Sequence, residues 1–278
     1  MKELAYKVKP GQKVDLRGID PSDTHGVARD EADARVAKVH EELTALQEVH
    51  YAAGQNGILL VLQGLDTAGK DGTIRHVMAA FNPASCRVES FKVPTPDERA
   101  HDFLWRIHRA TPPLGSITIF NRSHYEDVLV TRVHKLVPEE TIEERYDHIN
   151  SFEELLAESG TIVLKFFLYI SKNEQRDRLL AREADKGKAW KLSTSDWPEH
   201  ELYGAYVDAY QLALSKCSTK SAPWFIVPSD KKWYRNYAVA EIVADAMRGH
   251  MADWQKELNE RGKRQLATIA ALKQSKSK

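Results

Sequence analysis

The chain of 278 residues is long enough to bury one large core, or the cores of two small domains, and we favour one domain with appendages. Hydrophobic residues make up 42% and charged residues 29%, which excludes a disordered or membrane-embedded chain. Forty Lys and Arg residues balance forty Asp and Glu residues, so we expect no nucleic-acid partner and no attraction to acidic membranes. Any polyanion must then bind to local clusters of basic residues.

The sequence has no pattern typical of export or of a membrane span. Its first residues lack the continuous apolar core of a secretory signal, and the apolar stretch 162–170 is too short to cross a bilayer and contains Lys165. We therefore expect a cytoplasmic protein. In that reducing compartment Cys86 and Cys217 are expected to be passive packing residues without a disulfide.

Taken in chain order, the predicted elements begin with an N-terminal extension, residues 1–30, which contains Pro and Gly and has little periodicity. We expect it to lie extended on the surface or on a neighbouring subunit. Apolar residues then recur at three- and four-residue steps over 30–53, which predicts an amphipathic helix that ends at Gly54.

Short apolar runs and helical patterns alternate along the rest of the chain. Strands are predicted at 58–63, 87–93, 116–120, 161–170 and 224–227. Helices are predicted at 71–80, 96–109, 139–159, 173–184, 199–215 and from 232 into the C-terminal segment, with a frayed polar tail over 267–278. This alternation indicates a mostly parallel sheet covered on both faces, with ligands at the carboxyl ends of its strands.

The stretch Gly64-Leu-Asp-Thr-Ala-Gly-Lys-Asp-Gly-Thr73 follows the first predicted strand and nearly matches the phosphate-binding pattern G-x-x-x-x-G-K-[ST]. Glycines let such a loop turn its N–H groups toward an anion, and Lys70 adds a mobile positive charge. Asp71 replaces the hydroxyl of the pattern. Because carboxylates repel phosphate, Asp66 and Asp71 predict a divalent cation or a basic side chain close by; alternatively, Asp71 caps the helix.

The third predicted strand runs into Asn121-Arg-Ser-His-Tyr-Glu-Asp127. Asn121 occupies a position where many phosphate-loop proteins have an acid, and the acids come later, at Glu126 and Asp127. Arg122 lies where a planar guanidinium could bind a phosphate at two points.

Four motifs in this order resemble the second family of polyphosphate kinases, over roughly residues 36–247. They are the stretches 64–73 and 120–127, Trp190-Lys-x-Ser193 with Asp196, and Ala222-Pro-Trp224 followed by Val227-Pro-x-Asp-x-Lys-Trp233. The resemblance implies a three-layer α/β/α P-loop kinase fold similar to thymidylate kinases, with a parallel central sheet and a helical lid. It places the P-loop kinase domain at 31–250, the lid at about 176–200, and a C-terminal helix and polar tail at 251–278.

The resemblance also implies the reaction. Asn121 and Glu126 are similar to the branch, class III, that phosphorylates both nucleoside mono- and diphosphates. The expected substrates are inorganic polyphosphate as donor and AMP and ADP as acceptors, with GMP and GDP as further candidates and with ATP as donor in the reverse direction. The expected cofactor is Mg²⁺, with Mn²⁺ as an alternative, and the expected assembly is a homodimer or homotetramer.

The candidate site residues combine the motifs with basic residues of the lid and of the groove for the polyanion. The catalytic candidates are Asp66, Lys70, Arg122, Asp127 and Arg182. The substrate-binding candidates are Gly69, Asp71, Gly72, Thr73, Arg75, Asn121, Glu126, Arg178, Lys188, Lys191, Lys231 and Arg235. The metal-binding candidates are Asp66, Asp127 and Glu126.

Other readings of these residues stay open. An ATP-dependent nucleoside monophosphate kinase and a non-catalytic nucleotide-binding module are the alternative functions. A phosphohistidine at His124 is a minor alternative to packing. Base stacking on Trp190, Trp224, Trp233, Phe103 or Trp105 likewise competes with core packing.

Overall fold

A six-stranded sheet forms the centre of the computed structural model, which describes residues 3–185, 187 and 193–276, with side chains as far as residue 273. Its strands are β1 (Tyr6–Lys7), β2 (Gly57–Gln63), β3 (Cys86–Ser90), β4 (Ile117–Asn121), β5 (Thr161–Tyr169) and β6 (Trp224–Pro228). The spatial order is β1-β6-β5-β2-β4-β3, and β2 to β6 are mutually parallel. The five predicted strands are thereby confirmed.

Strand β1 pairs antiparallel with β6, so the sheet is mixed and, as predicted, mostly parallel. The N-terminal extension packs on the sheet of its own chain, beside β6, and its residues Leu4, Val8 and Leu16 are buried. A strand of two residues is too short to show alternation, and the extension was therefore predicted only as an irregular arm.

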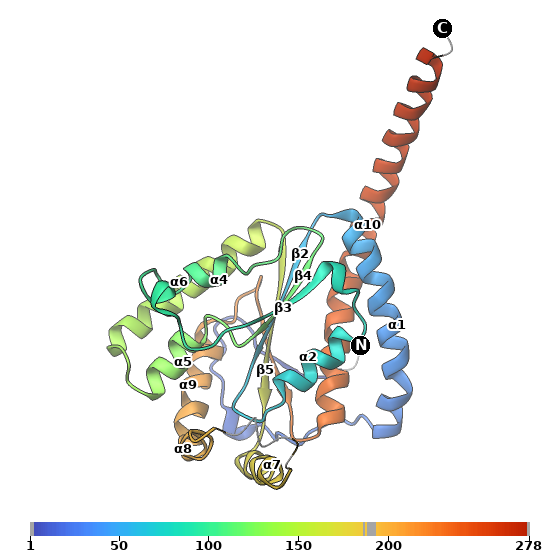
Figure 1. The fold of residues 1–278 in the computed structure, drawn as a ribbon. Helices are drawn as coiled ribbons and strands as arrows, with labels where there is room; N and C mark the ends of the chain where they lie inside the picture. The colour runs from blue at the N-terminus through green and yellow to red at the C-terminus, as the bar shows by residue number, and fades with distance from the viewer. Residues whose placement is uncertain (1–2, 186, 188–192, 277–278) are drawn as a thin grey trace.

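Helices cover both faces of the sheet (Figure 1). They are α1 (Arg29–Ala53), α2 (Lys70–Met78), α3 (Pro96–Arg99), α4 (Trp105–His108), α5 (Glu126–Val133), α6 (Glu139–Glu158), α7 (Lys172–Ala184), α8 (Asp196–Glu201), α9 (Tyr203–Lys216) and α10 (Lys232–Lys276). Helices α1, α2 and α10 pack together on one face, and α5, α6 and α9 pack on the other. This arrangement confirms the predicted three layers.

Two helical predictions were wrong in detail. The predicted helix 96–109 is two short helices, because the Asp102 carboxylate accepts a hydrogen bond from the Leu104 N–H (2.9 Å) and starts a new turn there. The predicted helix 199–215 is divided between α8 and α9 at Leu202. Helix α5 was not predicted, although it carries Glu126 and Asp127.

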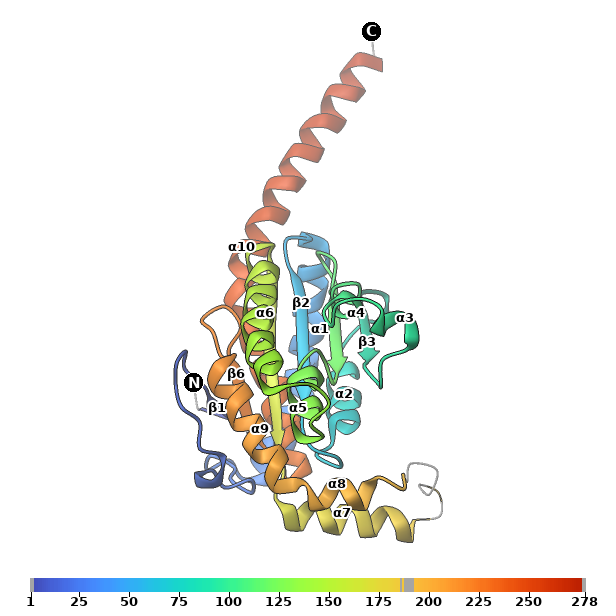
Figure 2. The same cartoon turned by 90° about the vertical axis from the view of Figure 1, so that its left-hand side faces the viewer.

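Helix α10 extends well beyond the body of the molecule (Figure 2). Its 45 residues correspond to about 68 Å. The buried Trp254 fixes it to the body, with Nε1 donating to Asn56 Oδ1 at 2.8 Å. The projecting part is helical through Lys276, so the predicted frayed tail was wrong, while its side chains are exposed as expected through Lys273.

Within the described residues, no helix combines the length and the apolar character that a bilayer span requires. Cys86 and Cys217 are buried free thiols, as predicted. Burial raises the pKa of each thiol to about 12, which keeps both protonated and unreactive.

Candidate active site

The glycine-rich loop joins β2 to α2 at the carboxyl edge of the sheet. A Cβ on Gly64 would lie 2.8 Å from the Leu168 carbonyl oxygen, so the loop packs against β5 at this point without room for a side chain. Gly69 has φ of +103° and forms the N-cap of α2. The first N–H groups of a helix have no intrahelical acceptor, so this end of α2 can bind an anion.

Lys70 is the first residue of α2 and its ammonium group lies across the loop. Nζ donates to the carbonyl oxygens of Gly64 (2.6 Å) and Leu65 (3.2 Å). Burial, together with repulsion from Arg122, lowers the pKa of Lys70. An incoming phosphate would give this ammonium group a stronger acceptor than neutral carbonyl groups.

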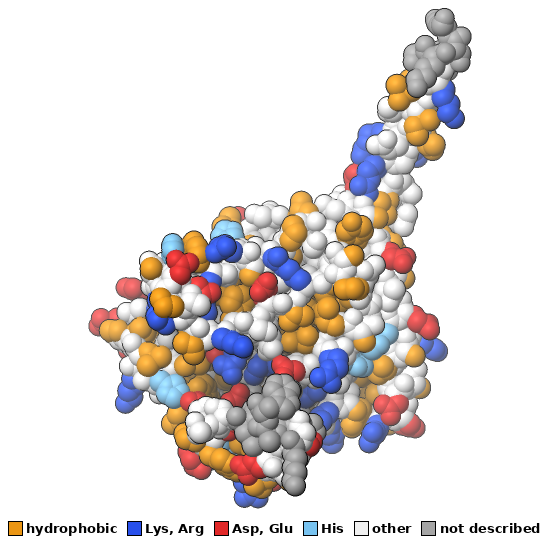
Figure 3. All heavy atoms as spheres, in the orientation of Figure 1, with side chains coloured by type: hydrophobic (Ala, Val, Ile, Leu, Met, Phe, Trp, Pro, Cys, Tyr) orange, Lys and Arg blue, Asp and Glu red, His pale blue; other side chains and the backbone are white. Residues whose placement is uncertain are grey.

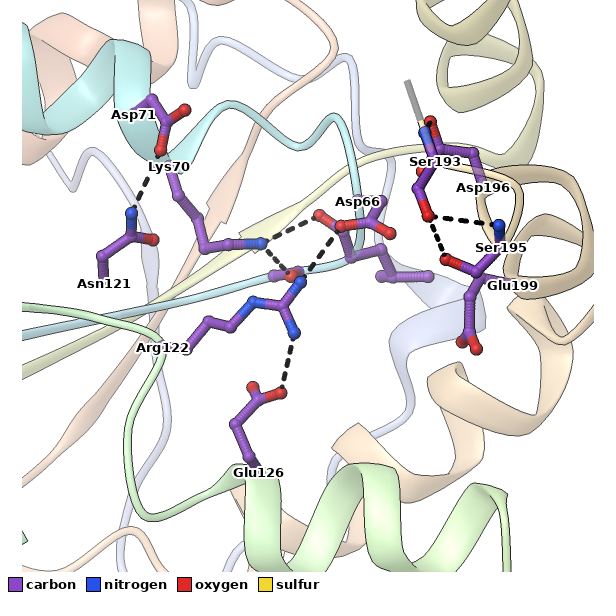
Figure 4. Close-up of polar contacts among 12 residues, drawn as sticks. Asp66, Lys70, Asp71, Asn121, Arg122, Glu126, Ser193, Ser195, Asp196 and Glu199 are labelled. Atoms are coloured by element: carbon purple, nitrogen blue, oxygen red, sulfur yellow. Dashed lines mark hydrogen bonds and ion pairs between the residues drawn. The ribbon is translucent and has the colours of Figure 1, made fainter. Parts of the chain in front are cut away.

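Arg122 lies between two carboxylates (Figure 4). It directly follows β4 in a left-handed conformation (φ +63°). Nη2 is 3.3 Å from Asp66 Oδ1 and Nη1 is 3.1 Å from Glu126 Oε2. The structure therefore places a basic side chain beside Asp66, one of the two possibilities predicted from the sequence. With 41% of its side chain exposed, Arg122 remains within reach of a ligand.

Asp71 has a partner on the neighbouring strand. Asn121, the last residue of β4, donates from Nδ2 to Asp71 Oδ1 at 3.0 Å. The N-cap of α2 is Gly69, which forms no side-chain cap. The loop and the end of β4 are thereby joined by a direct side-chain hydrogen bond.

Arg178 and Arg235, both predicted to bind substrate, donate hydrogen bonds to backbone carbonyl groups of the phosphate loop. Arg178 donates to the carbonyl oxygens of Thr67 (2.8 Å) and, on the neighbouring segment, of Ser229 (2.8 Å). Arg235 is 3% exposed and donates to the Ala68 carbonyl oxygen at 2.8 Å. These contacts fix the loop backbone, and direct contact of either guanidinium with substrate stays a prediction.

Arg235 also explains the small residues beside it. A Cβ on Gly69 would lie 1.9 Å from Arg235 Nη1, and one on Gly72 would lie 3.2 Å from Nη2. The buried Thr73 donates from Oγ1 to Asn236 Oδ1 at 3.3 Å. Gly72 and Thr73 therefore allow α2 to pack closely against the start of α10.

The predicted lid corresponds to α7 and α8, which lie side by side at the carboxyl end of the sheet (Figure 2). Arg182 of α7 pairs with Asp196 of α8, with 3.3 Å between Nη1 and Oδ2. Lys188 and Lys191 lie outside the described residues, as does Trp190. Arg75 on α2 and Lys231 before α10 are exposed to solvent.

The carboxylate of Asp127, a predicted metal ligand, faces two arginines. Its carboxylate is 3.9 Å from both Arg106 and Arg145. Burial raises the pKa of Asp127, against the attraction of Arg145 and Arg106. Within the described residues, no group of three or more His, Cys, Asp or Glu side chains is placed to hold a metal ion. The metal role of Asp127 stays a prediction that these contacts do not favour.

A cavity of about 260 Å³ opens beside the loop. Its lining includes Asp66, Arg122 and Glu126, together with Gly64 and Leu65 of the predicted phosphate loop. The other lining residues were not among the predicted site residues and are Val93, Leu129, Val130, His134, Gln175, Ser195, Glu199, Tyr206 and Tyr210. Recognition of α5 from the apolar positions after Glu126 would have found Leu129 and His134. No sequence spacing connects these two with Glu199 or Tyr206.

A second cluster of charged side chains lies in the core and includes His124, two residues after Arg122. Lys165 Nζ is 2.5 Å from Glu153 Oε2 and 2.9 Å from the Tyr125 hydroxyl. Tyr125 donates to Glu153 Oε1 at 2.9 Å, and His124 Nε2 lies 3.2 Å from the same oxygen. Burial acts to raise the pKa of Glu153, but Lys165 and His124 outweigh it and lower that pKa.

The burial of the His and Trp side chains bears on whether they contact substrate or only pack in the core. His124 has no exposed surface, which favours packing over a phosphohistidine. Trp224 is buried in the core, and the partly buried Trp233 packs against that core. Trp105 stacks on His101 (ring centroids 4.1 Å apart) and Arg109 lies 4.6 Å from its ring centroid, so both of these neighbours compete with a base.

Figure 3 shows several Lys and Arg side chains on the lower half of the face, interspersed with Asp and Glu, in a chain that is neutral as a whole. A strand, a glycine-rich loop and a helix beginning with Lys, at the carboxyl edge of a largely parallel sheet, together define the class of phosphate-loop kinase folds.

Comparison with known proteins identifies the family within this class. The model of the polyphosphate kinase 2 family matches residues 26–256. The AMP/ADP-polyphosphate phosphotransferase of Meiothermus ruber is 46% identical over 246 residues, which cover 88% of this chain and 92% of that protein. The ADP-polyphosphate phosphotransferase of Rhodopseudomonas palustris is 39% identical over 261 residues, or 89% and 90% of the two chains. This chain belongs to the polyphosphate kinase 2 family.

The fold agrees with a solved structure of that family. The crystal structure of polyphosphate kinase 2 from Arthrobacter aurescens TC1 matches with a TM-score of 0.85 and 41% sequence identity. The match covers 89% of this chain and 91% of the other. The phosphate loop, α5 and the α7–α8 pair lie within the residues that the family model matches.

Proposed function

We propose that this enzyme transfers the terminal phosphoryl group of inorganic polyphosphate to AMP and ADP. The observation that carries the proposal is the position of Arg122, which lies beside the phosphate loop and within the cavity, held by Asp66 and Glu126. The family, and the relative named for both AMP and ADP, support a nucleotide as the acceptor and polyphosphate as the donor.

In the proposed step, an oxygen of the nucleotide's terminal phosphate attacks the terminal phosphorus of the polymer. The new P–O bond forms as the bond to the penultimate phosphate breaks, and the polymer is shortened by one unit. Such a transfer depends on positioning and on positive charge near the oxygens that gain negative charge. Lys70, the N-terminus of α2 and Arg122 would supply that charge.

A divalent cation fits part of this site. Mg²⁺ binds oxygen ligands and commonly uses one or two carboxylates together with water and substrate phosphates. Asp66 and Glu126 both line the cavity and would hold such an ion. When bound, the ion would neutralise phosphate charge. Its binding would leave Arg122 free to turn from these carboxylates toward the phosphates.

One assay tests the proposed reaction. Purified protein is incubated with AMP, magnesium and long-chain polyphosphate, and the products are resolved over time. We expect ADP first and then ATP. Product formed from AMP and ATP but not from polyphosphate would favour an ATP-dependent monophosphate kinase, and nucleotide binding without product would favour a non-catalytic module.

Three further expectations belong to the same proposal. ATP would extend the polymer in the reverse direction, the site of action would be the cytoplasm, and the assembly would be a homodimer or homotetramer. Incubation with ATP and a short polyphosphate primer tests the first, localisation of the tagged protein tests the second, and light scattering tests the third.

A further inference from the structure

The cavity beside the phosphate loop has two chemically different ends. At one end lie the loop and Arg122, which suit phosphate groups. At the other end lie His134 after α5, Glu199 on α8 and Tyr206 on α9. Figure 4 shows that Glu126 and Glu199 come from separate helices.

The wall between the two ends is apolar. Val93, Leu129 and Val130 contribute to it. A phosphate chain gains nothing from such a wall and would be repelled by the carboxylate of Glu199. A flat, uncharged ring would instead be stabilised by contact with these side chains.

The length of the cavity suits one nucleotide. Glu126 and His134 are eight positions apart along α5 and its C-cap, which corresponds to about 12 Å. A nucleotide whose phosphate lies beside Arg122 would therefore extend its base toward His134 and Glu199.

The far end offers polar groups of defined character. Glu199 Oε1 lies 2.9 Å from His134 Nε2, and the Tyr206 hydroxyl lies 3.4 Å from the same nitrogen. Burial, followed by the hydrogen bond to Glu199, raises the pKa of Tyr206, so its hydroxyl stays protonated. A ligand thus meets a carboxylate, which accepts hydrogen bonds, beside a phenol whose one O–H already bonds to that carboxylate.

We propose that this end of the cavity binds the base of the acceptor nucleotide, with Glu199 accepting a hydrogen bond from the exocyclic amino group of a purine. The inference rests on the proposed function, because it assigns the acceptor of that reaction to this cavity. The Glu199 side chain is partly buried, with 25% of its surface exposed. Loss of a hydrogen bond to such a charged group is expected to change a rate or affinity roughly tenfold or more. Glu199 is therefore a specificity-determining residue.

The test compares two acceptors in the same enzyme. With polyphosphate as donor, kcat/KM is measured for AMP and for the 5′-monophosphate of purine riboside, which lacks the amino group. We expect the intact protein to prefer AMP by roughly tenfold or more. In Glu199→Met the preference should fall to near unity, and in Glu199→Gln it should be intermediate.

The ratio of the two acceptors separates specificity from folding, because damage to the fold would lower both rates together. Glu201→Met is the matched control: Glu201 lies on the same helix, its side chain is 76% exposed, and it should leave the ratio unchanged. An undiminished AMP preference in Glu199→Met, with the enzyme active, would overturn the inference alone. Absence of product from polyphosphate with any nucleotide would instead overturn the proposed function.

Discussion

Two ionic clusters lie on opposite sides of the same short loop and differ in exposure to solvent. The cavity cluster consists of Asp66, Arg122 and Glu126, and its arginine is 41% exposed. In the core cluster, Lys165 and Glu153 have no exposed surface, and His124 contributes to it from the loop that carries Arg122. A solvent-exposed charged side chain can leave its ion-pair partner and bind a ligand. A charged side chain buried in the core cannot, because an unpaired buried charge is costly.

The loop connects the two clusters through neighbouring residues. Arg122 adopts a left-handed backbone conformation, which is costly for a residue other than glycine. Ser123 is buried and accepts a hydrogen bond from Gln63 of β2 at 3.0 Å, and His124 enters the core cluster. The buried contacts therefore hold Arg122 in its conformation at the cavity.

The largest effect should follow from breaking the core cluster. Lys165→Met leaves the Glu153 carboxylate buried without its cation, and we expect a loss of about 3–5 kcal/mol of unfolding free energy, measured by urea denaturation. The double variant Lys165→Met/Glu153→Leu should recover much of that loss. Equal instability of both variants would mean that packing around Lys165, and not its charge, is what matters.

Breaking the cavity cluster should instead affect the reaction. Arg122→Ala removes a positive charge beside the transferred group, and kcat/KM with AMP and polyphosphate should fall roughly 10²–10³-fold while the denaturation midpoint changes little. Arg17→Ala, which removes a guanidinium paired with Asp208 on the exposed surface, should preserve the rate. A large loss of stability in Arg122→Ala would remove the distinction between the two clusters.

The Arg182–Asp196 pair is intermediate, with side chains 22% and 8% exposed. Arg182→Ala removes this ion pair between α7 and α8, and we expect turnover to fall roughly tenfold or more with little loss of folding. Arg176→Ala, in the same helix but 58% exposed, is the control. An unchanged turnover number in Arg182→Ala would exclude this pair from the mechanism.

The smallest effect concerns a partly buried histidine pair, His40 and His76, whose Nε2 atoms are 3.3 Å apart. Burial, then repulsion from His40 and Arg235, lowers the pKa of His76 from 6.5 to about 4. The unfolded chain binds more protons between these values, so stability should be lost as pH falls from 6.5 to 4. His76→Gln should reduce that loss by about 1 kcal/mol, after allowance for partial exposure. Parallel stability curves from pH 7 to 4 would contradict this assignment.

Local pattern was sufficient to predict the phosphate loop and the strands beside it. Residues 64–73 contain the whole signal for an anion site, and β2 is a continuous apolar run because helices cover both of its faces. Glu126 and Arg122 are four positions apart on a loop that enters α5, so their proximity also follows from sequence.

The contacts that the sequence did not indicate join residues that are far apart in the chain. Arg178 reaches Thr67 across 111 positions, and Arg235 reaches Ala68 across 167. A basic side chain in a kinase sequence gives no sign of whether it faces a phosphate or a backbone carbonyl group. Only the packing of α7 and α10 against the loop determines which partner is available.

The direction of α10 has a practical consequence. Its free end points away from the sheet edge that carries α7 and α8 (Figure 1). A reporter domain or a solid support joined there would lie far from the cavity beside the phosphate loop, and so would not block access of a long polymer. Attachment by this helix should therefore permit immobilised turnover, whereas linkage through lysines near the loop would obstruct it.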